Sequence, residues 1–172
     1  RALLPAFVRL HATGESEETV RDALHVFSAV LVPSAAGLAL LSEQVVAVYP
    51  SGEFAGAAPV LRILAASLIA VGPATVCGVY LTGVGRLTAI LGVYAVALPV
   101  QVVANLFLIP RWGAVGAATA TFTAYASLAL LFAGLLVASG IRLPLAAFAR
   151  HAVATAGMAG VVLLTRSLPI PV

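Results

Sequence analysis

Residues 87–138 read LTAILGVYAVALPVQVVANLFLIPRWGAVGAATATFTAYASLALLFAGLLVA, and this stretch decides the fold. It contains two apolar runs, residues 87–109 and 114–138, separated by a short Pro-Arg-Trp-Gly segment. A hydrocarbon core of about 30 Å needs about 20 apolar residues in an α-helix, so each run is long enough to cross a bilayer. The segment from Pro110 to Gly113 is typical of a tight turn, which predicts an antiparallel helical hairpin.

Three further stretches have the same apolar character: residues 24–48, 60–81 and 145–164. The last is interrupted by Arg150 and His151. Strand-like alternation of polar and apolar residues is missing, which argues against a membrane β-barrel. We therefore predict an all-α fold, a polytopic transmembrane helix bundle of about five spans. Residues 1–172 are expected to form one transmembrane domain, in which residues 1–23 hold the end of a preceding helix and a cytoplasmic loop.

The composition supports this class and excludes others. Hydrophobic residues make up 62% of the chain and charged residues 9%, whereas a soluble domain has about 25% charged residues. The chain has no lysine and its arginines are scattered, so it lacks the basic stripe of a nucleic-acid-binding surface. Its single cysteine provides neither a disulfide framework nor a Cys-rich metal site. We expect no metal and no cofactor.

The arginines predict the orientation of the spans. The loops on the side of the N-terminal segment carry six: Arg1, Arg9, Arg21, Arg86, Arg142 and Arg150. The loops on the other side carry three: Arg62, Arg111 and Arg166. The positive-inside rule then puts the N-terminal segment in the cytoplasm, as expected of a multi-pass protein of the cytoplasmic (inner) membrane. Because the chain opens with Arg1 rather than Met, we also expect it to be a fragment of a longer protein.

Prolines lie well inside three of the apolar stretches. Pro33, the pair Gly72-Pro73, and Pro99 each occur far from a predicted turn. A proline removes one backbone hydrogen bond and bends a helix. One interpretation is a set of helix hinges in a protein that alternates between two openings. The alternative is a static kink at each position.

Small residues recur at helical spacing at the start of the fourth span. Gly116 and Ala120 share one face, and Gly113 and Ala117 lie beside it. Without side-chain bulk another helix approaches closely and gains van der Waals contact, which drives association in lipid. We interpret these four residues as a helix-packing motif.

Few polar side chains lie within the spans. Gln101 and Asn105 are one helical turn apart, so they lie on one face. Unpaired amides in hydrocarbon are costly, so this face is expected to meet a neighbour or a water-filled cavity. Arg62 opens the second span and can extend to the interface. His25 and His151 lie near span ends, and neither has a carboxylate at metal-ligand spacing.

Catalytic motifs are missing from the sequence. There is one aspartate, Asp22, and hence no Asp-x-Asp for metal-held sugar nucleotides. No His-Glu-x-x-His, Gly-x-Ser-x-Gly or phosphate-loop pattern occurs. The sequence therefore predicts that the protein is not an enzyme.

These residues resemble the C-terminal half of the multidrug/oligosaccharidyl-lipid/polysaccharide exporter superfamily, and within it the polysaccharide-repeat (Wzx-like) flippases. The stretches that carry the resemblance are residues 3–7 (LLPAF), 41–46 (LSEQVV), 52–64 (GEFAGAAPVLRIL) and, above all, 105–121 (NLFLIPRWGAVGAATAT). The resemblance implies one lobe of a two-lobe transporter, whose other lobe is missing here. It further implies a flippase that moves a lipid-linked oligosaccharide or polysaccharide repeat unit across the cytoplasmic membrane by alternating access.

On this interpretation Gln101 and Asn105 face the cavity, and Arg62 or Arg86 lies near the path of the lipid diphosphate. The expected partners are membrane lipids, the lipid-linked glycan and the missing lobe. Two transporters of the same superfamily are alternatives: a multidrug or cation antiporter, and a flippase for the peptidoglycan lipid precursor. Alternatives from other classes are a membrane-embedded glycosyl- or acyltransferase and a membrane scaffold that transports nothing.

Overall fold

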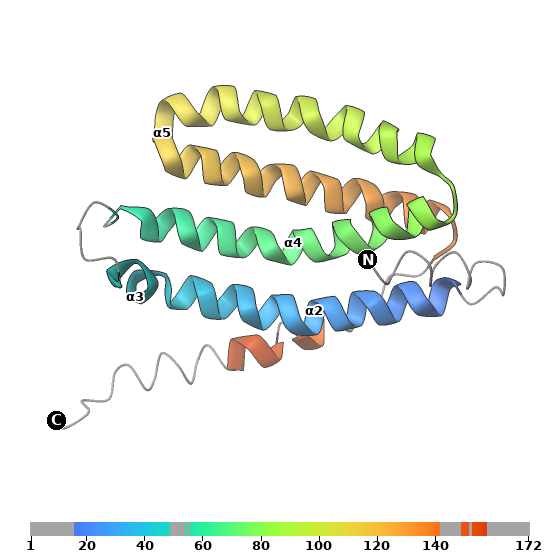
Figure 1. Cartoon of the computed structure of the whole chain (residues 1–172), viewed down its shortest axis with the longest axis horizontal. Helices are drawn as coiled ribbons and strands as arrows, with labels where there is room; N and C mark the ends of the chain where they lie inside the picture. The colour runs from blue at the N-terminus through green and yellow to red at the C-terminus, as the bar shows by residue number, and fades with distance from the viewer. Residues whose placement is uncertain (1–15, 49–53, 55, 142–148, 152, 158–172) are drawn as a thin grey trace.

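The computed structural model describes residues 16–48, 54, 56–141, 149–151 and 153–157 (Figure 1). Four helices account for most of them: α2 (Ser16–Leu40), α3 (Ser42–Ala47), α4 (Ala57–Gly83) and α5 (Leu87–Ala138). The residues at 149–151 and 153–157 are also helical. No strand occurs in these ranges, so the predicted all-α class is confirmed for the part of the chain that the structure describes.

Helix α5 is a hairpin rather than one straight rod. Its course is interrupted at Gly113, where φ is 54° and ψ is −127°, and the chain then runs back along itself (Figure 1). A side chain clashes with the backbone at such angles, so glycine is the residue that adopts them. We name residues 87–112 the outer arm and residues 114–138 the inner arm.

The boundaries of this turn differ from the expectation. Pro110, Arg111 and Trp112 were expected to lie in the turn, but all three are helical. The reversal is concentrated at Gly113 because this one residue supplies the positive φ that the chain needs. The outer arm therefore continues three residues beyond the predicted end of its span at residue 109.

The other boundaries shift as well. Helix α2 begins at Ser16, well before the expected span of residues 24–48, and it ends at Leu40. Its early start is favoured by Glu18, because an acidic residue stabilises the positive end of a helix. The expected span is then divided at Leu41, whose angles of φ −92° and ψ 6° separate α2 from α3. Helix α4 contains the whole of the expected span of residues 60–81.

Within the described residues, three helices are long and apolar enough to cross a membrane: α2 over Glu18–Leu40, α4 over Ala57–Gly83 and α5 over Leu87–Ala138. The turn at Gly113 divides the last of these into the two arms of the hairpin. Most of the predicted fifth span, residues 145–164, and all of residues 1–15 lie outside the described residues. The count of about five spans therefore stays a prediction.

The helices lie side by side in one layer. In Figure 1 the order is α2, α4, inner arm, outer arm. Helix α4 packs on α2 and on α5, whereas no Cα atom of α2 comes within 8 Å of one in α5. This arrangement leaves both faces of the layer without cover from the other described helices.

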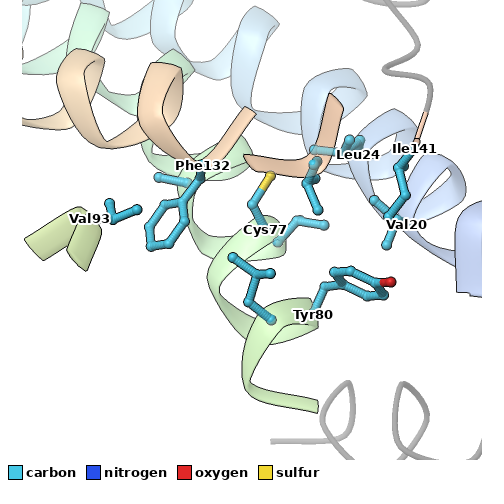
Figure 2. Packing of buried hydrophobic residues seen from close by; sticks show 11 residues of the cluster. Val20, Leu24, Cys77, Tyr80, Val93, Phe132 and Ile141 are labelled. Carbon is cyan, nitrogen blue, oxygen red and sulfur yellow. The ribbon is translucent and has the colours of Figure 1, made fainter. Parts of the chain in front are cut away.

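The main hydrophobic core lies at one end of this layer, where the chain starts α2 and ends both α4 and α5. There Val20 and Leu24 of α2 meet Cys77 of α4 and Phe132 of the inner arm (Figure 2). Phe132 is the largest side chain that is fully buried. This end is the one that the arginine count assigns to the cytoplasm.

The outer arm is the least covered helix of the layer. Of 25 large apolar side chains that are exposed in the described residues, 12 belong to it, including Leu91 and Leu106 at 68% and 67% exposure. Burying apolar surface is worth about 25 cal/mol per Å². Such a surface therefore requires lipid or another protein segment rather than water.

Candidate functional site

Gln101 and Asn105 lie in the middle of the outer arm, and both are partly buried. With 100° per residue, they share a stripe with Tyr94, whose ring packs edge-on against Phe132 at a centroid distance of 6.1 Å. Neither amide forms a hydrogen bond to any residue that the structure describes. The two amides thus remain available to a group outside the described helices.

Arg62 is engaged at the opposite end of the layer from the main core. Its Nε donates to the hydroxyl of Ser42 at 2.9 Å, and its guanidinium forms a salt bridge with Glu43. Ser42 is completely buried, whereas the side chains of Arg62 and Glu43 are 48% and 65% exposed. The arginine therefore fastens the short helix α3 to the start of α4.

Arg86 performs a similar role at the other end. It directly precedes α5, and its Nη1 donates to the hydroxyl of Ser139 at 2.6 Å, just past the end of that helix. Between Arg62 and the end of α4 at Gly83 lie 21 residues, a rise of about 30 Å. Arg62 and Arg86 are therefore at opposite ends of the layer, and the four residues expected to bind substrate do not converge on one site.

The expected hinges lie inside continuous helices. Pro33 is in α2, Pro73 in α4 and Pro99 in the outer arm. Gly72 is a contact point: a Cβ built on it would be 2.6 Å from Cδ1 of Leu31 in α2. Its small size allows α2 and α4 to pack closely.

The small residues of the predicted packing motif lie around the hairpin turn. Gly116 and Ala120 are buried, Ala117 is partly buried, and Gly113 makes the turn. A Cβ on Gly116 would be 2.1 Å from the carbonyl oxygen of Leu108, on the outer arm. The absence of a side chain at Gly116 is therefore what allows the two arms to meet.

A group of basic side chains was not anticipated as a cluster. The rings of His25 and His151 are in edge-on contact, with centroids 4.8 Å apart, and Nη2 of Arg150 lies 3.5 Å from Nε2 of His25. Arg150 and His151 are neighbours in the sequence, and both lie more than 120 positions after His25. The sequence signal was the interruption of the fifth apolar stretch by Arg150 and His151, which marks two polar groups that need partners.

Two hollows accompany these elements. A groove of about 480 Å³ between the arms of α5 is lined by apolar and small residues, among them Val93, Leu131 and Leu135. A smaller cavity of about 240 Å³ lies between α2 and the helical residues after 148, lined by Ala29, Pro33, His151, Ala154 and Thr155. Among the described residues, no group of three or more His, Cys, Asp or Glu side chains has a metal-binding arrangement.

Comparison with family models, with curated proteins and with solved structures gives no match. The fold therefore defines only the class of this chain, a layer of apolar helices that are long enough to span a membrane.

Proposed function

We propose that this chain is part of one lobe of a membrane transporter, a flippase that moves a lipid-linked oligosaccharide between the leaflets of the cytoplasmic membrane. The chain performs no covalent chemistry in this proposal. The N-terminal end of α2 lies on the cytoplasmic side, and the second lobe belongs to a part of the protein outside this sequence. The resemblance of residues 105–121 to the polysaccharide-repeat flippases supports the substrate class.

The single observation that carries the proposal is the pair of amides in the outer arm. Gln101 and Asn105 lie near the middle of an apolar helix at the edge of the layer, without a hydrogen bond in the described structure. At membrane depth such groups require a polar partner or water. A water-filled path for a hydrated glycan, lined on one side by this stripe, supplies both amides with hydrogen-bond partners.

The mechanism follows from the open arrangement of the helices. One face of the layer packs against the second lobe, and rocking of the two lobes opens the path alternately to each side. Sugar hydroxyls exchange hydrogen bonds with the amides, while the lipid tail stays in the bilayer. Because Arg62 and Arg86 lie at opposite ends of the layer, each serves the diphosphate at a different stage, one at each membrane surface.

The test is a double substitution of the amides in the full-length protein. Gln101→Leu with Asn105→Leu should lower the flipping rate of an undecaprenyl diphosphate-linked disaccharide in proteoliposomes by about tenfold or more, since each lost hydrogen bond is worth about 1 kcal/mol. Folding should be preserved, because leucine suits hydrocarbon better than an unpaired amide does. Unchanged flipping by a folded double variant would remove the amides from the site.

The matched control places the same number of leucines elsewhere on the same arm. Val96 and Val103 are 52% and 51% exposed, and at 100° per residue both lie on the opposite side of the helix from the amide stripe. Val96→Leu with Val103→Leu should leave flipping unchanged. The same proteoliposomes distinguish the alternatives: transport of a lipophilic cation indicates a drug antiporter, and flipping of only the peptidoglycan lipid precursor indicates that branch.

A further inference from the structure

The groove between the arms of α5 is open to the surface and has an apolar lining. A Cβ built on Gly92 of the outer arm or on Gly134 of the inner arm would meet no heavy atom within 4 Å. These two glycines help to leave a hollow of about 480 Å³ between the arms. Val96 and Leu130, which also line it, are 52% and 73% exposed. A hollow of this kind favours a hydrocarbon chain over water.

The groove is as deep as one leaflet of a bilayer. Its lining on the outer arm begins at Ala89 and ends at Val96, which by helix rise lie about 4.5 Å and about 15 Å from Arg86. An arginine at a helix end extends to the membrane surface, and half of a hydrocarbon core of about 30 Å is about 15 Å. The groove therefore runs from just below the surface to the bilayer midplane. This is the depth that an acyl chain of a phospholipid occupies, whereas a long polyprenyl tail would extend beyond it.

The groove faces away from the amides of the outer arm. At 100° per residue, Gly92 and Val96 lie on the opposite side of this helix from Gln101 and Asn105. In the proposed function the amides face the transport path and the second lobe, so the groove faces the bilayer. The molecule that surrounds the protein on that side is a lipid.

Arg86 lies at the end of the groove that meets the membrane surface. It directly precedes the outer arm, and its Nη1 donates to the hydroxyl of Ser139, which follows the inner arm. The guanidinium therefore joins the two walls of the groove. Its other N–H donors form no hydrogen bond to the residues that the structure describes. They are available to a phosphate, which arginine binds through paired donors.

The charge around the groove favours an anion. Residues 54–172 contain six arginines and neither aspartate nor glutamate. Among the described residues the salt bridge is that of Arg62 with Glu43, at the opposite end of the layer. No carboxylate in this part of the chain therefore neutralises Arg86, and none close by in the sequence repels a phosphate.

We propose that this groove binds one acyl chain of an anionic phospholipid and that Arg86 holds the phosphate of the same lipid. The chain fills the space that the two glycines leave between the arms, and the headgroup lies across the start of the outer arm and the end of the inner arm. The site goes beyond the proposed function, because its occupant is a lipid of the bilayer that is not transported. The transported lipid also carries phosphate, so its diphosphate reaches Arg86 only after this headgroup has moved aside.

The first test is a titration of the full-length protein in detergent with dioleoyl phosphatidylglycerol, in which native mass spectrometry counts the bound lipids. The wild type should retain one phosphatidylglycerol, and more tightly than it retains phosphatidylethanolamine, which has no net charge. Arg86→Gln should weaken the binding of phosphatidylglycerol about tenfold, because it removes a charge-assisted contact. The matched control is Arg111→Gln, which removes the same charge at the far end of the outer arm and should leave binding unchanged. Equal binding by these two variants, or equal retention of the two lipids by the wild type, would overturn the proposal.

A second pair of variants tests the groove itself. Gly92→Leu puts a side chain into the hollow and should weaken the binding of phosphatidylglycerol about tenfold, since about two CH₂ groups of the lipid lose their contact. Gly134→Leu fills the same hollow from the inner arm and should act alike, which keeps the test valid if one of the two variants does not fold. The matched control is Gly37→Leu in α2, where a Cβ also meets no heavy atom within 4 Å. If the folded groove variants bind the lipid as Gly37→Leu does, the groove is not its site.

Competitors identify the part of the lipid that is recognised. Glycerol 3-phosphate carries the phosphate without a chain, and undecaprenol carries a polyprenyl tail without a phosphate. Neither should displace phosphatidylglycerol at equal concentration. Displacement by glycerol 3-phosphate would reduce the site to an anion site, and displacement by undecaprenol would assign the groove to the tail of the transported lipid. Either result would refute the proposal.

The same spectra distinguish the remaining occupants and separate this proposal from the proposed function. A wild type that carries no phosphatidylglycerol, or that forms a dimer in place of the lipid complex, would assign the groove to another protein segment or to a second copy and would refute the lipid site. None of these measurements needs transport. A protein that binds the lipid but flips no glycan therefore contradicts the proposed function alone, and one that flips the glycan without binding the lipid contradicts the lipid site alone.

Discussion

Replacing Gly116 with alanine tests the packing of the hairpin directly. The new Cβ would be 2.1 Å from the oxygen and 2.5 Å from the carbon of the Leu108 carbonyl, and 3.0 Å from the amide nitrogen of Ile109. These are main-chain atoms of the outer arm, which cannot rotate away as a side chain can. A carbon–oxygen contact of ordinary length is about 3.3 Å, so the two arms must separate by about 1 Å.

The free-energy change is the sum of three effects. Forcing bulk into a packed contact costs about 1–3 kcal/mol. Moving the arms apart weakens the close Cα–H to carbonyl contact at Gly116, worth about 0.5–1 kcal/mol. Alanine regains about 1 kcal/mol of helix propensity. The net expectation is a loss of about 0.5–3 kcal/mol in the free energy of unfolding.

Gly134→Ala is the matched control on the same arm, because a Cβ there has no heavy atom within 4 Å. It should stabilise the protein by up to about 1 kcal/mol through helix propensity alone. The assay uses the single cysteine, Cys77, which is 1% exposed. A maleimide dye therefore reacts only when the core opens as the detergent-solubilised protein is heated.

For a chain of this size, each kcal/mol shifts the midpoint of thermal unfolding by about 2–4 °C. Gly116→Ala should therefore unfold several degrees below the wild type, whereas Gly134→Ala should match or exceed it. A midpoint for Gly116→Ala at or above that of Gly134→Ala would refute the close approach of the two arms at Leu108.

Four further substitutions examine other parts of the fold by the same thiol assay. Gly113→Ala forces an L side chain into a positive φ and should cost about 1–3 kcal/mol; an unchanged midpoint would contradict the one-residue turn. Phe132→Ala empties the largest buried position and should cost about 3–5 kcal/mol, and a loss below 1 kcal/mol would contradict its place in the core. Glu43→Gln removes an exposed ion pair and should lower the free energy of unfolding by at most about 1 kcal/mol. Arg62→Met also leaves the buried hydroxyl of Ser42 unpaired, so it should lower that free energy by about 1–3 kcal/mol. Equal losses for the two variants would contradict the role of Ser42.

The helical class and the positions of the main helices were predictable from the sequence because hydrophobic length is a strong signal. Residues 87–109 and 114–138 are predominantly apolar, and the glycine at 113 marks the reversal between them. The exact position of the turn was harder to predict from the sequence. A Pro-Arg-Trp-Gly segment carries several turn-forming residues, and only the backbone angles show that Gly113 alone makes the reversal.

The start of α2 at Ser16 was predictable from a serine cap with acidic residues beside it, whereas its separation from α3 was harder to predict. Hydropathy records where apolar residues begin, but the acidic first turn of α2 is helical as well, because charge at a helix end is independent of hydropathy. The division at Leu41 accompanies a polar contact, the bond between Arg62 and Ser42. The sequence contains both Arg62 and Ser42, but it does not show that the two residues lie close together.

Part of the candidate site was likewise predictable from the sequence, and part of it was not. Spacing alone put Gln101 and Asn105 on one face, since four residues make one helical turn. The contact of His25 with His151 depends on how α2 meets a segment far along the chain, and no local pattern encodes that. The arginine count had already put Arg62 and Arg86 on opposite sides of the spans, and the length of α4 keeps them apart.

The single-residue turn at Gly113 has a consequence for how the chain enters the bilayer during synthesis. With no linker between the two arms, neither arm can remain in the aqueous exit channel while the other partitions into lipid. The contacts that join them, such as Leu108 with Gly116, are close in sequence and form without waiting for distant segments. The arms of α5 therefore leave the ribosome as successive helices but enter the hydrocarbon together, as one insertion unit.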